Sequence, residues 1–151
     1  SPEFLVCDES IAALDVSIQA QILNLFVELK DQYNLTYLFI SHDIGVIEHI
    51  SDRVIVMYLG RIVETAPIAA FLKKPNHPYT SALLEGVPRL EVGKREYEPI
   101  SGEIPSPLSP PSGCHFHPRC KFATDRCHVE RPALREIATA HFAACHLNDQ
   151  V

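Results

Sequence analysis

Two short apolar segments, each followed at once by polar side chains, constrain the fold of this 151-residue chain more than any other feature. Residues 5–7 (Leu-Val-Cys) lead directly into Asp8 and Glu9, and residues 36–40 lead into residues 41–43 (Ser-His-Asp). Continuous apolar runs of this length are typical of strands covered on both faces, as in a parallel sheet flanked by helices. The sequence therefore predicts an α/β fold in which two neighbouring strands end in polar groups at one edge of a sheet.

A single helix is predicted between the two strands. Apolar residues recur at helical spacing over residues 16–30, and Asp15 stands where a helix N-cap is expected. The elements expected beyond residue 43 are a short helix through residues 46 and 47, a β-hairpin of strands 53–58 and 61–65, and short helices at 66–73 and 79–86.

A proline-rich stretch divides the chain. Five prolines between residues 99 and 111 interrupt regular structure, so we interpret residues 87–113 as an extended linker. It follows the α/β part at residues 5–86 and precedes a small irregular, cysteine-rich appendage at residues 114–151. Residues 1–4 resemble the remnant of a cloning site and are left out of this interpretation.

The charge of the chain argues against nucleic acid as a partner. The formal net charge is −6, and no run of Lys and Arg is longer than the pair Lys73–Lys74, so no surface suited to phosphate backbones is expected. No apolar run approaches the roughly 20 residues that cross a bilayer, and no charged-then-apolar leader opens the chain. We therefore expect neither a membrane-spanning helix nor an exported precursor.

The acidic pair after the first strand suits a site that transfers phosphoryl groups. In such a site one carboxylate holds Mg²⁺ and a second orients or deprotonates the attacking water, and Asp8 and Glu9 have the chemistry for both tasks. An Asp-Glu pair after a strand is more often a helix-capping pair, because acidic side chains favour helix N-termini. Taken alone, the pair is weak evidence for catalysis.

Two further elements favour the functional interpretation. Residues 13–15 (Ala-Leu-Asp) follow within one loop of the acidic pair, and His42 closes the next apolar strand. The tips of adjacent parallel strands lie side by side, so we expect His42 near Glu9, within reach of a terminal phosphate. A lone histidine at a strand end is usually a structural group, but the three elements in this order reverse that expectation.

These three motifs resemble the nucleotide-binding subunits of ABC transporters. Residues 5–9 match the Walker B strand, residues 13–15 the D-loop and residues 41–43 the switch-histidine loop. Residues 10–12 (Ser-Ile-Ala) depart from the family, which usually has a proline and small hydroxylated residues there. The departure alters the loop but leaves the charged positions in place.

The resemblance implies a role for each charged or polar residue. Asp8 would serve Mg²⁺, Glu9 would act as general base, His42 would sense the γ-phosphate, and Asp15 would communicate across a dimer of two such domains. No Gly-Lys-Ser/Thr loop occurs in the chain, and the Leu-Ser-Gly-Gly-Gln signature and the glutamine loop are missing too. We therefore expect the distal half of an ATPase subunit, which does not hydrolyse ATP by itself.

Motifs in the tail narrow the resemblance to the ATP-binding subunits of oligopeptide and dipeptide importers. They lie at residues 76–80, 101–107, 111–114, 116–120 and 144–147. The resemblance implies a subunit that powers peptide import, bound peripherally to the cytoplasmic side of a bacterial inner membrane. Its partners would be transmembrane permease subunits and a second ATP-binding subunit, identical or paralogous, while the peptides carried are not specified by these residues.

Four cysteines of the tail, Cys114, Cys120, Cys127 and Cys145, have the composition of a metal site. Four thiolates can surround a zinc ion or an iron–sulfur cluster. The first two gaps enclose five and six residues, wider than the two to four of most zinc knuckles, which suits a larger object. The family resemblance points to a four-iron four-sulfur cluster; zinc, with histidines as substitute ligands, and disulfides remain alternatives.

Two broader questions stay open at the level of sequence. The cluster's default role is a structural staple, since the short appendage has little apolar material of its own. The alternative to a transporter subunit is a stand-alone metal-binding interaction module, or one that senses iron or redox state. The apolar strands at residues 5–7 and 36–40 also lack covering elements, so we expect the chain to self-associate.

Overall fold

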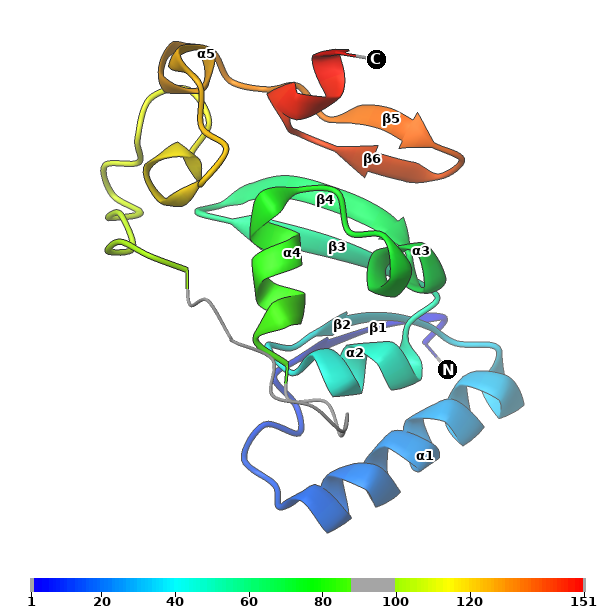
Figure 1. The fold of residues 1–151 in the computed structure, drawn as a ribbon. Coiled ribbons are helices and arrows are strands. Elements are labelled where there is room, and N and C mark those ends of the chain that lie inside the picture. Colours follow the sequence, from blue (N-terminus) through cyan, green and yellow to red (C-terminus); the bar gives the residue numbers. More distant parts are fainter. Residues whose placement is uncertain (1, 88–99, 151) are drawn as a thin grey trace, which may run out of the picture. The chain divides into compact units, whose positions relative to one another are not determined.

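The computed structural model of the protein describes residues 2–87 and 100–150 (Figure 1). The chain divides into two compact units, Ser1–Asp52 and Arg53–Val151, which are described separately below. No helix in the described residues is long and apolar enough to cross a membrane. Helices and strands alternate in the first unit and mix with irregular segments in the second, so the mixed α/β class is confirmed.

The first unit is a β–α–β arrangement followed by a short helix. Strands β1 (Phe4–Asp8) and β2 (Thr36–Ile40) pair in parallel, with Phe4 opposite Thr36 and Asp8 opposite Ile40. Helix α1 (Val16–Tyr33) connects them, and helix α2 (Ile44–Ile50) follows β2. The parallel pair and its crossover helix are as predicted, and β1 includes Phe4, which the sequence interpretation had left out.

A small apolar core joins the two helices to one face of this strand pair. Its buried members are Ile11, Leu23, Val46 and Ile50. Phe26 of α1 packs edge-on against Tyr37 and Phe39 of β2, with ring centroids 5.6 Å apart in both pairs. Edge-to-face contacts of this kind add to the stabilisation that apolar burial provides.

The opposite face of the strand pair is uncovered, as expected of apolar strands that lack covering elements. Phe4, Val6, Leu38 and Ile40 are all exposed. Strand residues alternate between the two faces of a sheet. Helix α1 can therefore cover only the face that carries Tyr37 and Phe39. The two apolar runs therefore form strands as predicted, and one of their two faces stays uncovered.

Both ends of helix α1 have local causes. The Asp15 side chain accepts a hydrogen bond from the Ile18 amide at 3.0 Å, which is the predicted N-cap contact. At the other end Asn34 adopts a left-handed conformation with φ 50°, and the Leu35 amide donates to the Lys30 carbonyl. The helix consequently runs three residues beyond the predicted end at residue 30.

The second unit contains a four-stranded antiparallel sheet of order β3-β4-β6-β5. Strands β3 (Arg53–Tyr58) and β4 (Arg61–Pro67) form the predicted hairpin around Leu59 and Gly60, which both have positive φ, as a tight hairpin turn requires. Strands β5 (Arg135–Ala138) and β6 (His141–Ala143) extend this sheet from the tail.

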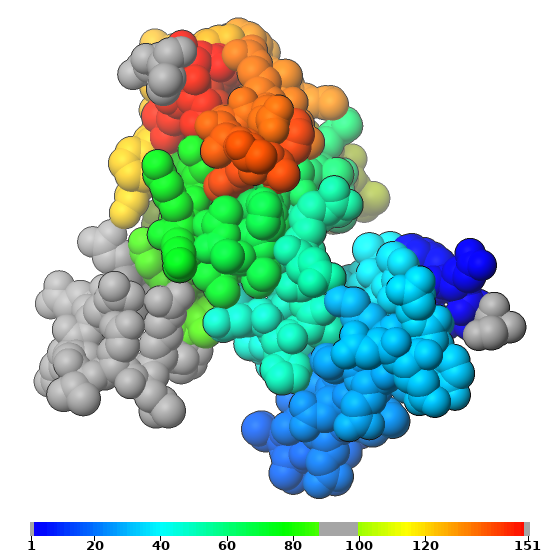
Figure 2. All heavy atoms as spheres, turned by 90° about the vertical axis from the view of Figure 1, so that its right-hand side faces the viewer, coloured from blue at the N-terminus to red at the C-terminus, as the bar shows by residue number. Residues whose placement is uncertain are grey.

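The appendage is therefore more regular than predicted. Besides β5 and β6, it contains the 3₁₀ helix η1 (His117–Arg119), helix α5 (Asp125–Val129) and the 3₁₀ helix η2 (His146–Gln150). In the space-filling view its orange and red atoms lie directly on the green atoms that precede the linker (Figure 2). Strand pairing with β4 supplies hydrogen bonds that such short strands lack alone.

The two helices after the hairpin form close to their predicted positions. Helix α3 spans Ile68–Lys73, because Ala66 and Pro67 still pair with β3 and so belong to β4. Helix α4 spans Pro78–Glu85, with His77 as its N-cap. Residues 100–113 form no helix or strand, as their prolines predict, whereas residues 88–99 of the expected linker lie outside the described residues.

A buried glutamate ties the sheet together. The Glu64 carboxylate on β4 has no solvent exposure and accepts hydrogen bonds from the backbone amides of Asn76 and His77, at 2.9 and 2.8 Å. Its Oε1 also lies 2.7 Å from Nε2 of His141 on β6. One carboxylate thus joins β4, the loop before α4 and the tail, and these contacts offset the cost of its burial.

Candidate functional sites

The ends of β1 and β2 bring two predicted site residues together. Glu9 follows β1 directly, and its amide donates to the Ile40 carbonyl at the end of β2, at 3.0 Å. Its carboxylate oxygens lie 3.0 and 3.1 Å from Nδ1 of His42. The predicted proximity of these two side chains is confirmed by the parallel pairing of the strands that carry them.

The contact between Glu9 and His42 has a clear electrostatic consequence. The hydrogen bond with Glu9, and then the negative charge of the same carboxylate, raise the pKa of His42 above its usual value. Both side chains are exposed, Glu9 by 41% and His42 by 78%. The pair is thus an open surface arrangement whose polar atoms can meet another molecule without rearranging an interior.

Glu9 also adopts an unusual backbone conformation. Its φ is 48°, in the left-handed region that residues other than glycine seldom occupy. Such conformations carry a cost and cluster at functional sites. The turn directs the residue after β1 toward the end of β2, as the amide bond to Ile40 shows.

The two aspartates of the predicted site have different surroundings. Asp8 is exposed, and its side chain forms no hydrogen bond or ion pair with the described part of the chain. Asp15 caps α1, accepting from the Ser17 hydroxyl at 2.7 Å and from the Ile18 amide at 3.0 Å. The Ser17 hydroxyl first, and then the amide, lower the pKa of Asp15. These Asp15 contacts lie within its own helix and do not involve Glu9 or His42.

In the second unit the four tail cysteines line one cavity of about 170 Å³. Cys114 precedes η1, Cys120 follows it, Cys127 lies in α5, and Cys145 stands between β6 and η2. All four are partly buried, and none forms a disulfide. The thiols that the sequence grouped by position are therefore grouped in space.

The protein environment acts on these thiols in two opposite directions. Burial raises the pKa of Cys114 and Cys120, and it raises that of Cys145 to about 11. Backbone N–H groups two residues further along the chain lower each of these pKa values. Thr124 supplies a hydroxyl 3.4 Å from the Cys127 Sγ. The cavity thus disfavours free thiolates while holding donors for sulfur that becomes anionic.

A single metal ion does not match the side chains as they stand. Among residues 2–87 and 100–150, no group of three or more Cys, His, Asp or Glu side chains is arranged to hold one. Two imidazoles that line the cavity are also engaged: Nδ1 of His117 lies 2.9 Å from the Cys114 carbonyl, and both ring nitrogens of His146 have partners. The donor set at this cavity is therefore the four sulfurs that line it.

Sequence reasoning missed the polar residues that frame this cavity. Arg126, His146 and Asp149 line it together with the thiols. Their partners lie up to 23 residues away in the chain, so no local pattern identifies them. Thr124 also lines the cavity, and a local pattern could have identified it. It stands three residues before Cys127, at the N-cap position of a short helix.

Comparisons with known proteins support the resemblance drawn from the motifs. A family described as "Oligopeptide/dipeptide transporter, C-terminal region" matches residues 63–127. The chain is 51% identical over 150 residues to the oligopeptide transport ATP-binding protein AppF of Bacillus subtilis, covering 97% of this chain and 46% of that protein.

Two further relatives agree. The probable peptide ABC transporter ATP-binding protein y4tS of Sinorhizobium fredii is 50% identical over 147 residues, covering 97% of this chain and 42% of the relative. The dipeptide transport ATP-binding protein DppF of Haemophilus influenzae is 48% identical over 145 residues, covering 95% and 44%. The resemblance to peptide ABC transporter ATP-binding subunits is therefore confirmed, and the chain spans less than half the length of these relatives.

Proposed function

We propose that the intact protein is the ATP-hydrolysing subunit that powers oligopeptide or dipeptide import by an ABC transporter. The observation that carries this proposal is an identity of about 50% to peptide-transport ATP-binding proteins across nearly the whole chain. In this proposal the subunit binds peripherally at the cytoplasmic side of a bacterial membrane. It acts there with permease subunits and a second ATP-binding subunit.

The strand-end residues would perform the chemistry in the intact subunit. Asp8 would hold Mg²⁺, which neutralises charge on the phosphates, and Glu9 would take a proton from the attacking water. His42 would contact the γ-phosphate, and Asp15 would act across the dimer of two such domains. The 3.0 Å contact between Glu9 and His42 supports this assignment, because a base and a phosphate-binding group must lie at one edge.

The 151-residue chain by itself should not hydrolyse ATP. It contains no Gly-Lys-Ser/Thr loop, so no backbone amides and lysine are available to hold the β- and γ-phosphates. Magnesium-dependent turnover by this chain alone would contradict the proposal.

The roles are tested in a full-length protein that contains these residues. Glu9→Gln should abolish ATP hydrolysis, because the amide cannot accept the proton from water. Glu48→Gln removes another exposed carboxylate of the first unit and should leave hydrolysis unchanged. Equal activity in all three proteins would exclude Glu9 as the base.

We further propose that the four tail thiols hold a four-iron four-sulfur cluster. The four sulfurs around one cavity, the absence of disulfides and the donors near them support this group over zinc. Bound there, the cluster would supply covalent cross-links between η1, α5 and the segment that follows β6. Its proposed role is therefore a structural staple.

Cluster binding is tested by metal analysis of protein prepared without oxygen. A broad visible absorption that dithionite bleaches, with iron and sulfide in equal amounts, is expected. Cys145→Ser should lose this signal, while Cys7→Ser, at a buried thiol in the first unit, should retain it. A colourless protein that contains zinc would favour the zinc alternative.

A metal-binding interaction module, or one that senses iron or redox state, is the second candidate. The enclosed thiol cavity favours it, because that site is complete within the chain whereas the phosphate site is not. A module should bind its metal and keep its biological role when Glu9 is changed to Gln. A transporter subunit should lose peptide uptake with the same change.

The exposed face of the first unit supports self-association of the chain. Phe4 and Val6 of β1 and Leu38 and Ile40 of β2 form an apolar face, with Val6 directly opposite Leu38. Val6→Lys together with Leu38→Lys should shift sedimentation toward a monomer. Ile55→Lys changes an exposed apolar residue of the second unit and should not. A wild-type chain that stays monomeric at high concentration would contradict this proposal.

A further inference from the structure

Cys145 lies furthest along the chain from the other three cysteines that line the cavity, and it reaches the cavity from a different segment of the tail. Cys114, Cys120 and Cys127 lie within one short segment that includes η1 and α5, whereas Cys145 follows the β5–β6 hairpin. The amide of Cys114 donates to the Cys127 carbonyl at 2.9 Å, which fixes the first segment internally. Cys145 is held from two sides: before it, the Ala144 amide donates to the Val63 carbonyl at 2.8 Å, and after it, contacts between α5 and η2 join its segment to the first one.

An ion-pair network connects these two segments. Arg126, next to Cys127 in α5, donates to both Glu130 oxygens at 2.6 and 2.7 Å and to Asp149 of η2 at 2.5 Å. A planar guanidinium can make these contacts together, and a lysine ammonium cannot reproduce the fork. Arg126 thus holds one carboxylate of its own segment and one from the segment after Cys145.

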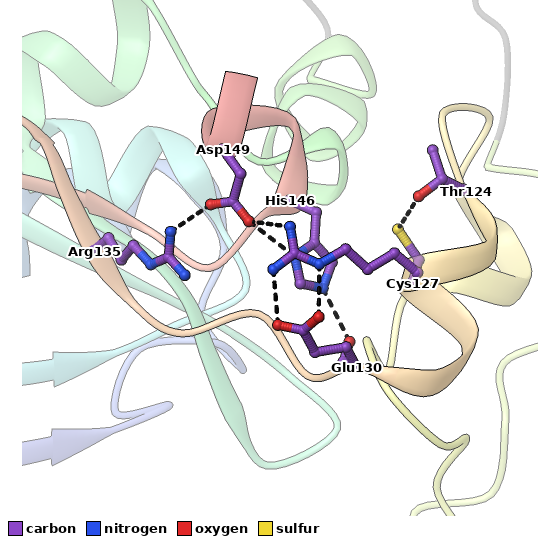
Figure 3. A network of polar contacts seen from close by, with 7 residues as sticks. Thr124, Cys127, Glu130, Arg135, His146 and Asp149 are labelled. Carbon is purple, nitrogen blue, oxygen red and sulfur yellow. Dashed lines mark hydrogen bonds and ion pairs between the residues drawn. The ribbon is translucent and has the colours of Figure 1, made fainter. Parts of the chain in front are cut away.

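Asp149 is the centre of the network (Figure 3). Its second oxygen accepts from Arg135 at 2.5 Å, and its first lies 3.3 Å from Nδ1 of His146. The Nε2 of His146, the residue directly after Cys145, lies 2.9 Å from the Glu130 carbonyl. Asp149 is 15% exposed and the His146 side chain 6%, whereas the side chains of Arg126, Glu130 and Arg135 are 42%, 52% and 56% exposed. The network is therefore shielded from solvent at its centre and open at its outer members.

We propose that Arg126, Asp149 and His146 form a clamp that places the Cys145 thiol at the cavity before a metal group binds. The three are positioning residues, since they act through Cys145 and the neighbouring segments. This inference rests on the proposed function of the cavity as a cluster site. Groups around metal ligands that fix their orientation commonly change metal affinity by about 10- to 100-fold when they are removed.

The clamp is tested first in the reduced, metal-free chain of 151 residues. Each thiol's reaction with iodoacetamide is followed by peptide mass spectrometry. Arg126→Gln and Asp149→Asn should each speed modification of Cys145 by about 10-fold, while Cys114 and Cys120 change little. In Arg126→Lys, the rate of Cys145 modification should lie between the rates of wild type and Arg126→Gln. Arg131→Gln, at an exposed arginine outside the network, is the matched control and should behave as wild type.

The second measurement uses chains reconstituted anaerobically with iron and sulfide. Release of iron to a chelator should be about 10- to 100-fold faster for Arg126→Gln and Asp149→Asn than for wild type. The double variant should be no faster than either single variant, because both changes break the same clamp.

The two possible failures are distinguishable. A wild-type chain that binds no iron and sulfide defeats the proposed cluster, but the metal-free thiol rates still decide whether the clamp exists. Unchanged Cys145 reactivity in both network variants overturns the clamp. Equal acceleration at all four thiols overturns it too, because that pattern means general unfolding of the tail.

Discussion

The two candidate sites of this chain differ in where their polar atoms point. At the strand ends of the first unit, Glu9 and His42 contact one another and are otherwise open to solvent. In the second unit, four thiols face a common enclosed space whose rim is held by ion pairs. The first arrangement suits residues that await groups from elsewhere, and the second suits residues that hold a ligand by themselves.

The same difference appears between two glutamates that both contact a histidine. Glu9 has one partner and is 41% exposed, whereas Glu64 is fully buried and accepts from two amides in addition to its contact with His141. Water can replace the partner of Glu9 but not those of Glu64. Stability should therefore depend on the second carboxylate and not on the first.

The largest expected effect is that of Glu64→Ala. It leaves the amides of Asn76 and His77 and the His141 ring without their acceptor, and such losses at buried ionic groups cost about 3–5 kcal/mol. Amide hydrogen exchange of β3 and β4 in the second unit, followed over a series of urea concentrations, measures this loss.

Glu9→Gln is the matched control for this experiment and should leave this exchange unchanged. Exchange that accelerates equally in both variants would mean that burial does not separate the two carboxylates. A small effect of Glu64→Ala would mean that the loop before α4 finds other partners.

The next effect is a dependence of stability on pH that arises at His77. Burial lowers the pKa of this imidazole from 6.5 to about 4, although the charge of Glu64 opposes the change. Between these two values the unfolded chain takes up a proton that the folded chain refuses, so stability falls as the pH falls. The difference corresponds to about 3 kcal/mol between neutral pH and pH 4.

His77→Asn tests this dependence directly. In the wild type the Tyr79 amide donates to the His77 ring at 3.1 Å. Asparagine at this position still offers an N-cap acceptor to that amide, but its side chain does not titrate. The stability curve of the variant between pH 6.5 and 4 should therefore be flatter than that of wild type. Parallel curves would show that other groups produce the acid loss.

The local features of the fold were predictable from sequence. The capping by Asp15, the hairpin turn at Leu59 and Gly60 and the pairing of β1 with β2 follow from short-range patterns. The approach of Glu9 to His42 followed as well, because parallel strands place their ends at one edge. In these cases the residues that decide the structure are neighbours in the chain or in adjacent strands.

The features that were not predicted depend on distant partners. Strands β5 and β6 are too short to show an alternating pattern, and β6 forms its ladder with β4 about 80 residues away. A buried charged residue such as Glu64 is unexpected until its donors, one of them 77 residues away, are known.

A smaller effect is expected from Asp15→Ala in the first unit. The alanine removes the acceptor for the Ile18 amide, so the first turn of α1 should open more often, with roughly fivefold lower amide protection from hydrogen exchange. Asp31→Ala, away from the helix start, is the control. Unchanged amide protection at residues 16–19 would mean that Asp15 does not stabilise the start of the helix. Its proposed role between two domains would then be strengthened.

The smallest effect tests the open site itself. The hydrogen bond and charge of Glu9 raise the pKa of His42, so any stabilisation from this pair is present in acid and lost as the pH rises past that raised pKa. Glu9→Gln should return the His42 pKa toward its ordinary value, as measured by NMR titration of the ring protons. Glu48→Gln should not change it. Because both side chains are exposed, this change should leave unfolding unaffected, which is the behaviour of a site available for a ligand. A His42 pKa that does not respond to Glu9→Gln would mean that the two side chains are apart in solution, and the proposed phosphate edge would lose its geometric support.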